Sequence, residues 1–189
     1  MSKKKKIIIL VILSLLIVAA TITIILLSNR TEKYYIPLAI LMGEDAKDAD
    51  QKYLEEYEKY VLKPKVATGV WENAYINSDR EIVLEYTKEQ KKAEIEGLVE
   101  ILSFEVIGLP YMDLMGTTSC DCNDDYTKVT VVLGSEKNTD SFVSVYISGM
   151  LMYQILNDVP VDKASVEAEI TYLDNKETEN ITYNCYNLY

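Results

Sequence analysis

Histidine is absent from this chain of 189 residues, and cysteine, tryptophan and phenylalanine occur only three times, once and twice. Without histidine, Ser/His/Asp and Cys/His nucleophilic systems and most zinc sites are excluded. The sequence also has no glycine-rich phosphate-binding loop. These absences predict a protein that is not an enzyme and that needs no cofactor.

Basic residues are few outside the amino terminus. Beyond Lys3 to Lys6, fifteen lysines and arginines stand against thirty aspartates and glutamates, a net charge of −15. Such a surface repels phosphate backbones, so no nucleic-acid partner is expected. An acidic surface also keeps a protein soluble, so the charge alone does not identify a partner.

Charged residues are missing altogether from Ile7 to Leu27, where sixteen of twenty-one residues are Ile, Leu or Val. As a helix this segment would span about 31 Å, close to the hydrocarbon thickness of a bilayer. It is therefore predicted to be a transmembrane helix. A cleaved signal peptide is the alternative, although its apolar core is normally roughly 7 to 15 residues long. The only alanine pair, Ala19 and Ala20, also lies in the middle of the segment.

Lys3 to Lys6 predict the orientation, because positive charge beside a spanning segment tends to stay cytoplasmic. The expected location is the cell membrane, as a single-pass protein that contacts the lipid bilayer through its anchor. The expected order is a cytoplasmic basic tail (residues 1–6), the anchor (7–27), a juxtamembrane segment with a candidate first strand (28–43) and an extracytoplasmic domain (44–189).

Hydrophobic residues at helical spacing predict three helices in the outer domain. The first covers residues 46–62, and a proline two residues later ends it. The second covers 87–107 and begins with a capping box of Thr87 and Gln90. The third covers 140–157, where a strand is the alternative because the segment begins with strand-forming residues.

Alternating apolar and polar residues predict strands, and together the elements predict an α+β fold. We expect one two-layer domain with a mainly antiparallel sheet of five or six strands and two to three helices on one face. The other face of the sheet would be exposed and would carry Glu167 and Glu169. The strands are expected over 36–42, 66–76, 82–86, 129–133, 165–172 and 181–185, with a polar loop over 117–125.

Trp71, Asn73 and Tyr75 form the first candidate site. Alternate residues of a strand share a face, so the three side chains would form a platform on which a sugar ring could stack. Packing of these side chains in the core is the alternative.

The three cysteines form the second candidate site. In an oxidising compartment, Cys120 or Cys122 is expected to pair with Cys185 and tie the polar loop to the last strand. Closing a loop of roughly sixty residues would stabilise the fold by about 4 kcal/mol. Unpaired thiols, or a metal or redox site of Cys120 and Cys122, are the alternatives.

Asp121, Asn123 and Asp125 occupy the first, third and fifth positions of a calcium-binding loop. The rest of the motif fails, because Tyr126 and Val132 stand where glycine and a bidentate glutamate are required. A solvated turn is the alternative.

The combination of an anchor, one compact domain and no catalytic set predicts a non-enzymatic accessory or assembly module that docks on other envelope proteins. The alternative is an extracellular module that binds cell-wall glycan or a small molecule through Trp71, Asn73 and Tyr75.

Overall fold

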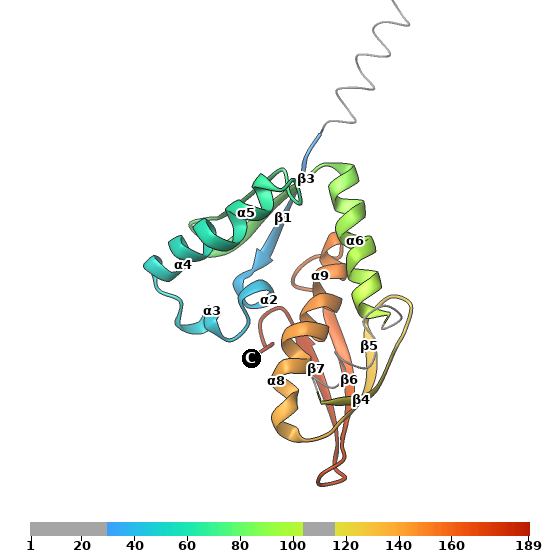
Figure 1. Ribbon diagram of the computed structural model, residues 1–189. Helices are drawn as coiled ribbons and strands as arrows, with labels where there is room; N and C mark the ends of the chain where they lie inside the picture. The colour runs from blue at the N-terminus through green and yellow to red at the C-terminus, as the bar shows by residue number, and fades with distance from the viewer. Residues whose placement is uncertain (1–29, 104–115) are drawn as a thin grey trace, which may run out of the picture.

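The structure, a computed structural model, describes residues 30–103 and 116–189 (Figure 1). The strands are β1 (Glu32–Pro37), β2 (Asn73–Ile76), β3 (Glu81–Tyr86), β4 (Thr117–Cys122), β5 (Lys128–Leu133), β6 (Ser165–Tyr172) and β7 (Thr178–Asn184). The α-helices are α2 (Leu38–Met42), α3 (Asp45–Asp48), α4 (Gln51–Tyr57), α5 (Lys63–Ala67), α6 (Lys88–Leu102), α8 (Thr139–Phe142) and α9 (Ser148–Leu156). They are accompanied by the π-helical turns η1 (Glu58–Leu62) and η3 (Val143–Ile147) and the 3-10 helix η2 (Glu136–Asn138).

Sheet A consists of three antiparallel strands in the order β1-β3-β2. β2 and β3 form an antiparallel hairpin. Its turn is fixed by Asn77, whose side-chain oxygen accepts hydrogen bonds from the backbone N–H groups of Asp79 and Glu81 at 3.0 and 2.9 Å. Tyr34 and Ile36 of β1 point to the buried side of the sheet.

Sheet B consists of four strands in the order β4-β5-β6-β7. β4 and β5, and likewise β6 and β7, are antiparallel neighbours, whereas β5 and β6 run parallel. A parallel pair needs a crossover connection, and the helical segment α8-η3-α9 supplies it. This segment covers the inner face of the sheet. The buried residues of that face include Val129, Val131, Leu133, Val166, Ala168 and Ile170.

Helix α9 lies at the centre of the molecule, and seven of its nine residues are buried. It contacts α2, α6, β1 and β6, so one continuous core joins the two sheets (Figure 1). Two of its buried residues are polar, Ser148 and Gln154, and the Gln154 amide donates to the carbonyls of Tyr126 and Ser165 at 2.7 and 2.9 Å. Because its oxygen also accepts from the Ser165 N–H at 3.1 Å, this amide is fully hydrogen-bonded inside the core.

The predicted fold class needs two corrections. The structure is α+β, but it has two sheets rather than one, and β5 pairs with β6 in parallel. Within residues 30–103 and 116–189, no helix is both long and apolar enough to cross a bilayer. The predicted transmembrane helix and the single-pass membrane location are therefore not supported and are withdrawn. The segment itself, residues 7–27, lies outside the described residues.

Three predicted elements near the amino terminus are wrong in their bounds. The expected strand over 36–42 is the end of β1 followed by α2. Pro64 does not end a helix but lies in the first turn of α5, directly after the wide turn η1, where a missing N–H is tolerated. The expected strand over 66–76 shortens to β2, because α5 extends to Ala67.

The later elements agree better with the sequence. The capping box of Thr87 and Gln90 is present at the start of α6, which ends at Leu102; the rest of the predicted helix falls mainly outside the described residues. The segment predicted as a helix over 140–157 is helical through Leu156, and the alternative of a strand is wrong. The expected polar loop over 117–125 is wrong, because β4 occupies most of it as an edge strand.

Candidate functional site

The side of sheet B that faces away from α9 is polar, and we call it the outer face of sheet B. Side chains at alternate positions of four strands form it. The register places Lys128 beside Glu167, and Thr130 beside Glu169, on the parallel pair. The outer face includes Asp121, Lys128, Thr130, Glu167, Glu169, Asn180 and Thr182.

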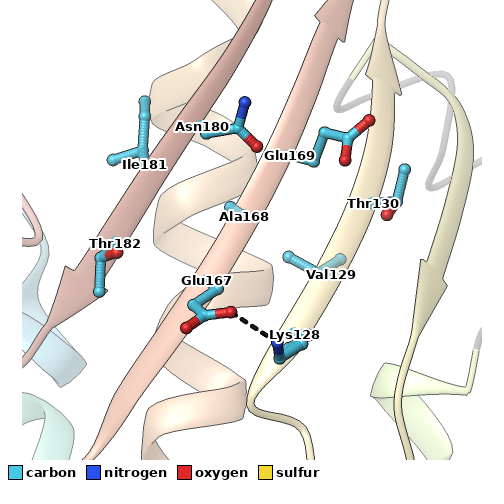
Figure 2. Close-up of a pocket in the computed structure, with 9 residues that line it drawn as sticks. All are labelled: Lys128, Val129, Thr130, Glu167, Ala168, Glu169, Asn180, Ile181 and Thr182. Atoms are coloured by element: carbon cyan, nitrogen blue, oxygen red, sulfur yellow. Dashed lines mark ion pairs between the residues drawn. The ribbon is translucent and has the colours of Figure 1, made fainter.

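A shallow hollow of about 320 Å³ lies on the outer face of sheet B. Figure 2 shows the side chains of Glu167, Glu169 and Asn180 on the side of the sheet that faces away from the helix. The Lys128 ammonium is 2.8 Å from a carboxylate oxygen of Glu167, which forms an ion pair at one end of the hollow. The flat sheet holds these groups in fixed rows because both β5 and β7 pair with β6.

Hydrogen-bond acceptors at the other end of the hollow are unused. Within the described residues, the side chains of Thr130, Glu169 and Asn180 have no hydrogen-bond or ion-pair partner, although the register places them in one row across three strands. Asp121 of β4 extends this row. The outer face thus carries three carboxylates against one lysine that is already paired, which favours a cationic ligand.

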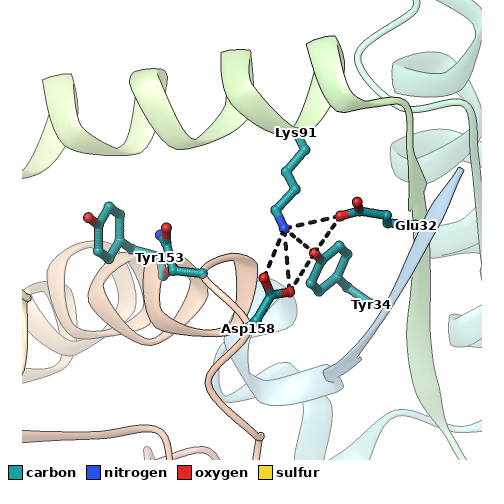
Figure 3. A network of polar contacts seen from close by, with 6 residues as sticks. Glu32, Tyr34, Lys91, Tyr153 and Asp158 are labelled. Carbon is teal, nitrogen blue, oxygen red and sulfur yellow. Dashed lines mark hydrogen bonds and ion pairs between the residues drawn. The ribbon is translucent and has the colours of Figure 1, made fainter. Parts of the chain in front are cut away.

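Lys91 of α6 forms a second polar cluster, with Glu32 and Tyr34 of β1 and with Asp158 after α9 (Figure 3). Its ammonium lies 3.1 Å from Glu32 and 3.4 Å from Asp158, donates to the Tyr34 hydroxyl, and sits 4.8 Å from the centre of the Tyr34 ring. The Tyr34 hydroxyl is 2.9 Å from the carboxylates of both Glu32 and Asp158. This cluster ties sheet A to α6 and to the end of α9.

The electrostatics of the Lys91 cluster favour a structural role. Burial alone lowers the pKa of Lys91, but its hydrogen bonds to Tyr34 and Glu32 outweigh burial and leave the pKa raised. Burial raises the pKa of Tyr34 to about 12. The hydrogen bonds from Lys91 and Tyr34 lower the pKa of Glu32. At neutral pH each group keeps its ordinary charge, so neither Lys91 nor Tyr34 is poised as a base.

The structure separates the three residues of the predicted sugar platform. Asn73 and Tyr75 lie on the exposed side of sheet A, whereas Trp71 precedes β2 and is only 2% exposed. The Lys65 ammonium lies 4.8 Å from the centre of the Trp71 ring. Trp71 therefore packs in the core, as the alternative predicted, because strand alternation begins only at Asn73.

The exposed side of sheet A also carries Tyr35 and Lys33 of β1, which were not among the predicted site residues. Tyr35 of β1 and Tyr75 of β2 both pair with Val83 of the central strand, and Lys33 of β1 lies 2.8 Å from Glu85. Val83 is fully buried, while Tyr35 is 48% exposed. Alternation along Glu32–Pro37 could have indicated that Tyr35 is exposed. It does so only when this segment is recognised as a strand that pairs with β3.

All three cysteines are free in the structure. Cys120 and Cys122 lie on β4 and Cys185 follows β7, at opposite edges of sheet B. Three strand spacings of about 4.8 Å separate these edges, roughly twice the Cα separation that a disulfide spans. The predicted bridge to Cys185 is therefore not formed. Burial raises the pKa of Cys120 to about 12 and also raises the pKa of Cys122, which disfavours reactive thiolates.

The predicted calcium ligands do not converge. Asp121 lies on the outer face of sheet B. Asn123 is occupied in the β4–β5 turn, where its side-chain oxygen accepts from the N–H groups of Thr127 and Lys128 at 2.9 and 2.8 Å. Among the described residues, no group of three or more Cys, Asp or Glu is placed to hold a metal ion. Asp125 lies in the exposed turn between β4 and β5.

Comparison with known proteins adds no assignment. No protein-family model matches the chain, and neither a curated protein nor a solved structure shows significant similarity to it.

Proposed function

We propose that this chain is a non-enzymatic interaction module that binds a basic segment of another protein on the outer face of sheet B. The observation that carries the proposal is the row of unused acceptors formed by Thr130, Glu169 and Asn180 within the hollow. A guanidinium or ammonium group offers several donors and a positive charge, which match a carboxylate flanked by hydroxyl and amide oxygens.

The charge distribution supports a basic partner. The chain as a whole carries a net charge of −11, which steers cationic partners toward it over a distance of about 8 Å at physiological salt. The outer face has one cation, Lys128, and its pairing with Glu167 leaves Glu169 available.

An acid–base role for Glu167 and Glu169 is less well supported. A carboxyl group that acts as a general acid at neutral pH needs a desolvated environment that raises its pKa. Glu167 is 62% exposed, Glu169 is also exposed, and both stand on an open sheet face. The same exposure suits a surface that meets a partner.

The proposal is tested with a nonapeptide of alternating arginine and threonine, acetylated and amidated at its ends. Binding to the full chain is measured by calorimetry at low and at physiological salt. Replacing both glutamates (Glu167→Gln with Glu169→Gln) should weaken binding about tenfold or more, because charged hydrogen bonds are lost.

Glu100→Gln on α6 is the matched control, since Glu100 is exposed and its side chain has no hydrogen bond or ion pair with a described residue. It should change the affinity by less than about threefold, as expected for a distant screened charge. Equal losses in the two variants would mean unspecific attraction to an acidic protein, and an absence of binding to the wild-type chain would refute the proposal.

A glycan-binding module is the second candidate, favoured by the row of Tyr35, Val83 and Tyr75 on sheet A. Two tyrosines over a buried valine, with the Asn73 amide beside Tyr75, form a platform of the kind that stacks on sugar rings. Trp71 fluorescence would not report such binding, because the indole is buried. Shifts of the Tyr35 and Tyr75 ring resonances on adding wall oligosaccharides would support this candidate, and unchanged spectra across the panel would remove it.

A further inference from the structure

Resting on the proposed function, we infer that the basic segment docks as an extended strand along the free edge of β7 and enlarges sheet B to five strands. β7 is the last strand of the sheet order β4-β5-β6-β7. An edge strand that is neither covered nor blunted is a template for pairing with another chain.

The hydrogen bonds of Asn187 show which backbone groups of β7 point away from β6. The Asn187 amide donates to the carbonyl oxygen of Thr182 at 3.0 Å, and its side-chain oxygen accepts from the Asn184 N–H at 2.6 Å. Along an antiparallel strand, the backbone N–H and C=O groups of successive residues point to opposite sides. The groups of Thr178 and Asn180 therefore point away from β6, like those of Thr182 and Asn184.

These outward groups are unused over most of the strand. The N–H and C=O of Thr178 and Asn180, and the N–H of Thr182, have no hydrogen-bond partner in the described residues, and all three residues are exposed. β7 contains no proline or lysine, the residues that commonly block an edge. The edge therefore offers donors and acceptors in alternation.

The length of the edge limits what can dock. Asn187 occupies it at Thr182 and Asn184, and the turn that follows β6 ends it before Thr178. Five residues, Thr178 to Thr182, remain, which span about 17 Å. A partner strand of about five residues fills this length.

The charges along the edge favour a basic peptide over a second copy of the chain. Side chains of an added strand would lie beside Asn180, with Glu169 one strand further in and Glu177 and Glu179 at the near end. Arginine or lysine at alternate positions could lie across Asn180 toward Glu169. Two copies paired through β7 would instead bring like charges together, which is destabilising.

The inference is tested on the isotope-labelled full chain with the arginine–threonine nonapeptide. On binding, the amide protons of Thr178, Asn180 and Thr182 should shift in the NMR spectrum and become protected from hydrogen exchange. A peptide that carries N-methyl groups on one set of alternate residues should bind about tenfold more weakly, because those N–H groups can no longer pair with β7. The peptide methylated on the other set should keep its affinity.

A pair of variants tests the contribution of the backbone N–H of Asn180. Asn180→Pro removes an N–H that points away from β6, so it should leave the β6–β7 pairing intact. Asn180→Ala loses the same side chain and keeps the N–H. We expect the proline variant to bind the nonapeptide about tenfold more weakly than the alanine variant.

The outcomes separate the two proposals. Binding that depends on Glu167 and Glu169 but leaves the β7 amides unshifted, with both N-methylated peptides equal, overturns strand addition and leaves the proposed function standing. An absence of any binding removes both. A dimer of the full chain by light scattering, abolished by Asn180→Pro, would show that a second copy occupies the edge and would also overturn the inference.

Discussion

At the scale of single residues, the structure depends on a few polar contacts inside or beside the core. Lys91 has three oxygen partners, in β1 and after α9, whereas the indole N–H of Trp71 and the hydroxyl of Tyr86 are buried with no hydrogen-bond partner in the described part of the chain. A buried polar atom contributes to stability only where its partner is present, so these residues should respond differently to substitution.

Lys91→Met should lower the free energy of unfolding by about 1–2 kcal/mol, because its partners Glu32 and Asp158 are partly exposed and recover some hydration. Lys92→Met is the control: Lys92 is 76% exposed, and its ion pair with Glu96 at 3.6 Å should contribute at most about 0.5 kcal/mol. Urea unfolding measures both. Equal losses would contradict the role given to the cluster.

The same cluster predicts a dependence on pH. The pKa of Glu32 is lower in the folded chain than its ordinary value of 4.5. Its contribution to stability is therefore complete above pH 4.5 and is lost as the pH falls through the lower, folded pKa. Below pH 4.5, the stability of the wild type should fall more steeply than that of Lys91→Met. Parallel pH curves for the two proteins would mean that Lys91 does not lower the pKa of Glu32.

Tyr86→Phe and Tyr146→Phe form a second pair. Among the described residues, no group meets the buried Tyr86 hydroxyl in hydrogen-bonding geometry, so its removal should change stability by less than about 0.5 kcal/mol. The Tyr146 hydroxyl donates to the carbonyl of Leu102, and its removal should cost about 1–2 kcal/mol. Thermal unfolding distinguishes them; a larger loss for Tyr86→Phe would mean that its hydroxyl is hydrogen-bonded.

At the scale of elements, the sequence predicts those whose signals are local. The capping box of α6 and the alternation in β5, β6 and β7 were predicted correctly because neighbouring residues determine them. β4 was missed because its inward residues are Thr117, Cys120 and Cys122 rather than large aliphatic residues, so the apolar period is weak. Its pairing with β5 is a tertiary effect.

Gly116, just before β4, tests this part of the fold. Its φ is +60°, and a Cβ there would lie 1.9 Å from the side-chain amide of Asn138, so Gly116→Ala should destabilise the protein by about 1–3 kcal/mol. Gly97 lies within α6 with open space around it, and Gly97→Ala should stabilise by about 0.5–1 kcal/mol. Chemical unfolding of both variants checks the opposite signs; equal effects would contradict the placement of β4.

At the scale of the whole molecule, the sequence indicated α+β, but the prediction of a single sheet was wrong, because the strands form two sheets. Strand order and the parallel pairing of β5 with β6 depend on where α8 and α9 cross, and no local pattern encodes that. The exposed face with Glu167 and Glu169 was predicted from alternation alone. Thr130 and Asn180 were not, since only the register brings them beside Glu169.

The separation of Trp71 from Asn73 and Tyr75, and of Cys185 from the other cysteines, has the same origin. Spacing along the chain places residues on one face only while the strand lasts, and β2 begins after Trp71. Two cysteines can pair only where their Cα atoms lie within about 7 Å, and sheet order places these at opposite edges. The sequence therefore supplied the candidate residues, while tertiary structure decided which of them meet.

Site-specific photo-crosslinking in the cells that make the protein shows whether a basic segment binds the outer face of sheet B. A photoreactive amino acid replaces Thr130 on the outer face of sheet B or, as a control, Lys176 in the exposed turn between β6 and β7. We predict a discrete adduct from position 130 only, joined to a segment rich in arginine or lysine and lost when Glu169→Lys is added. No adduct at position 130, or the same adducts from position 176, would contradict the account.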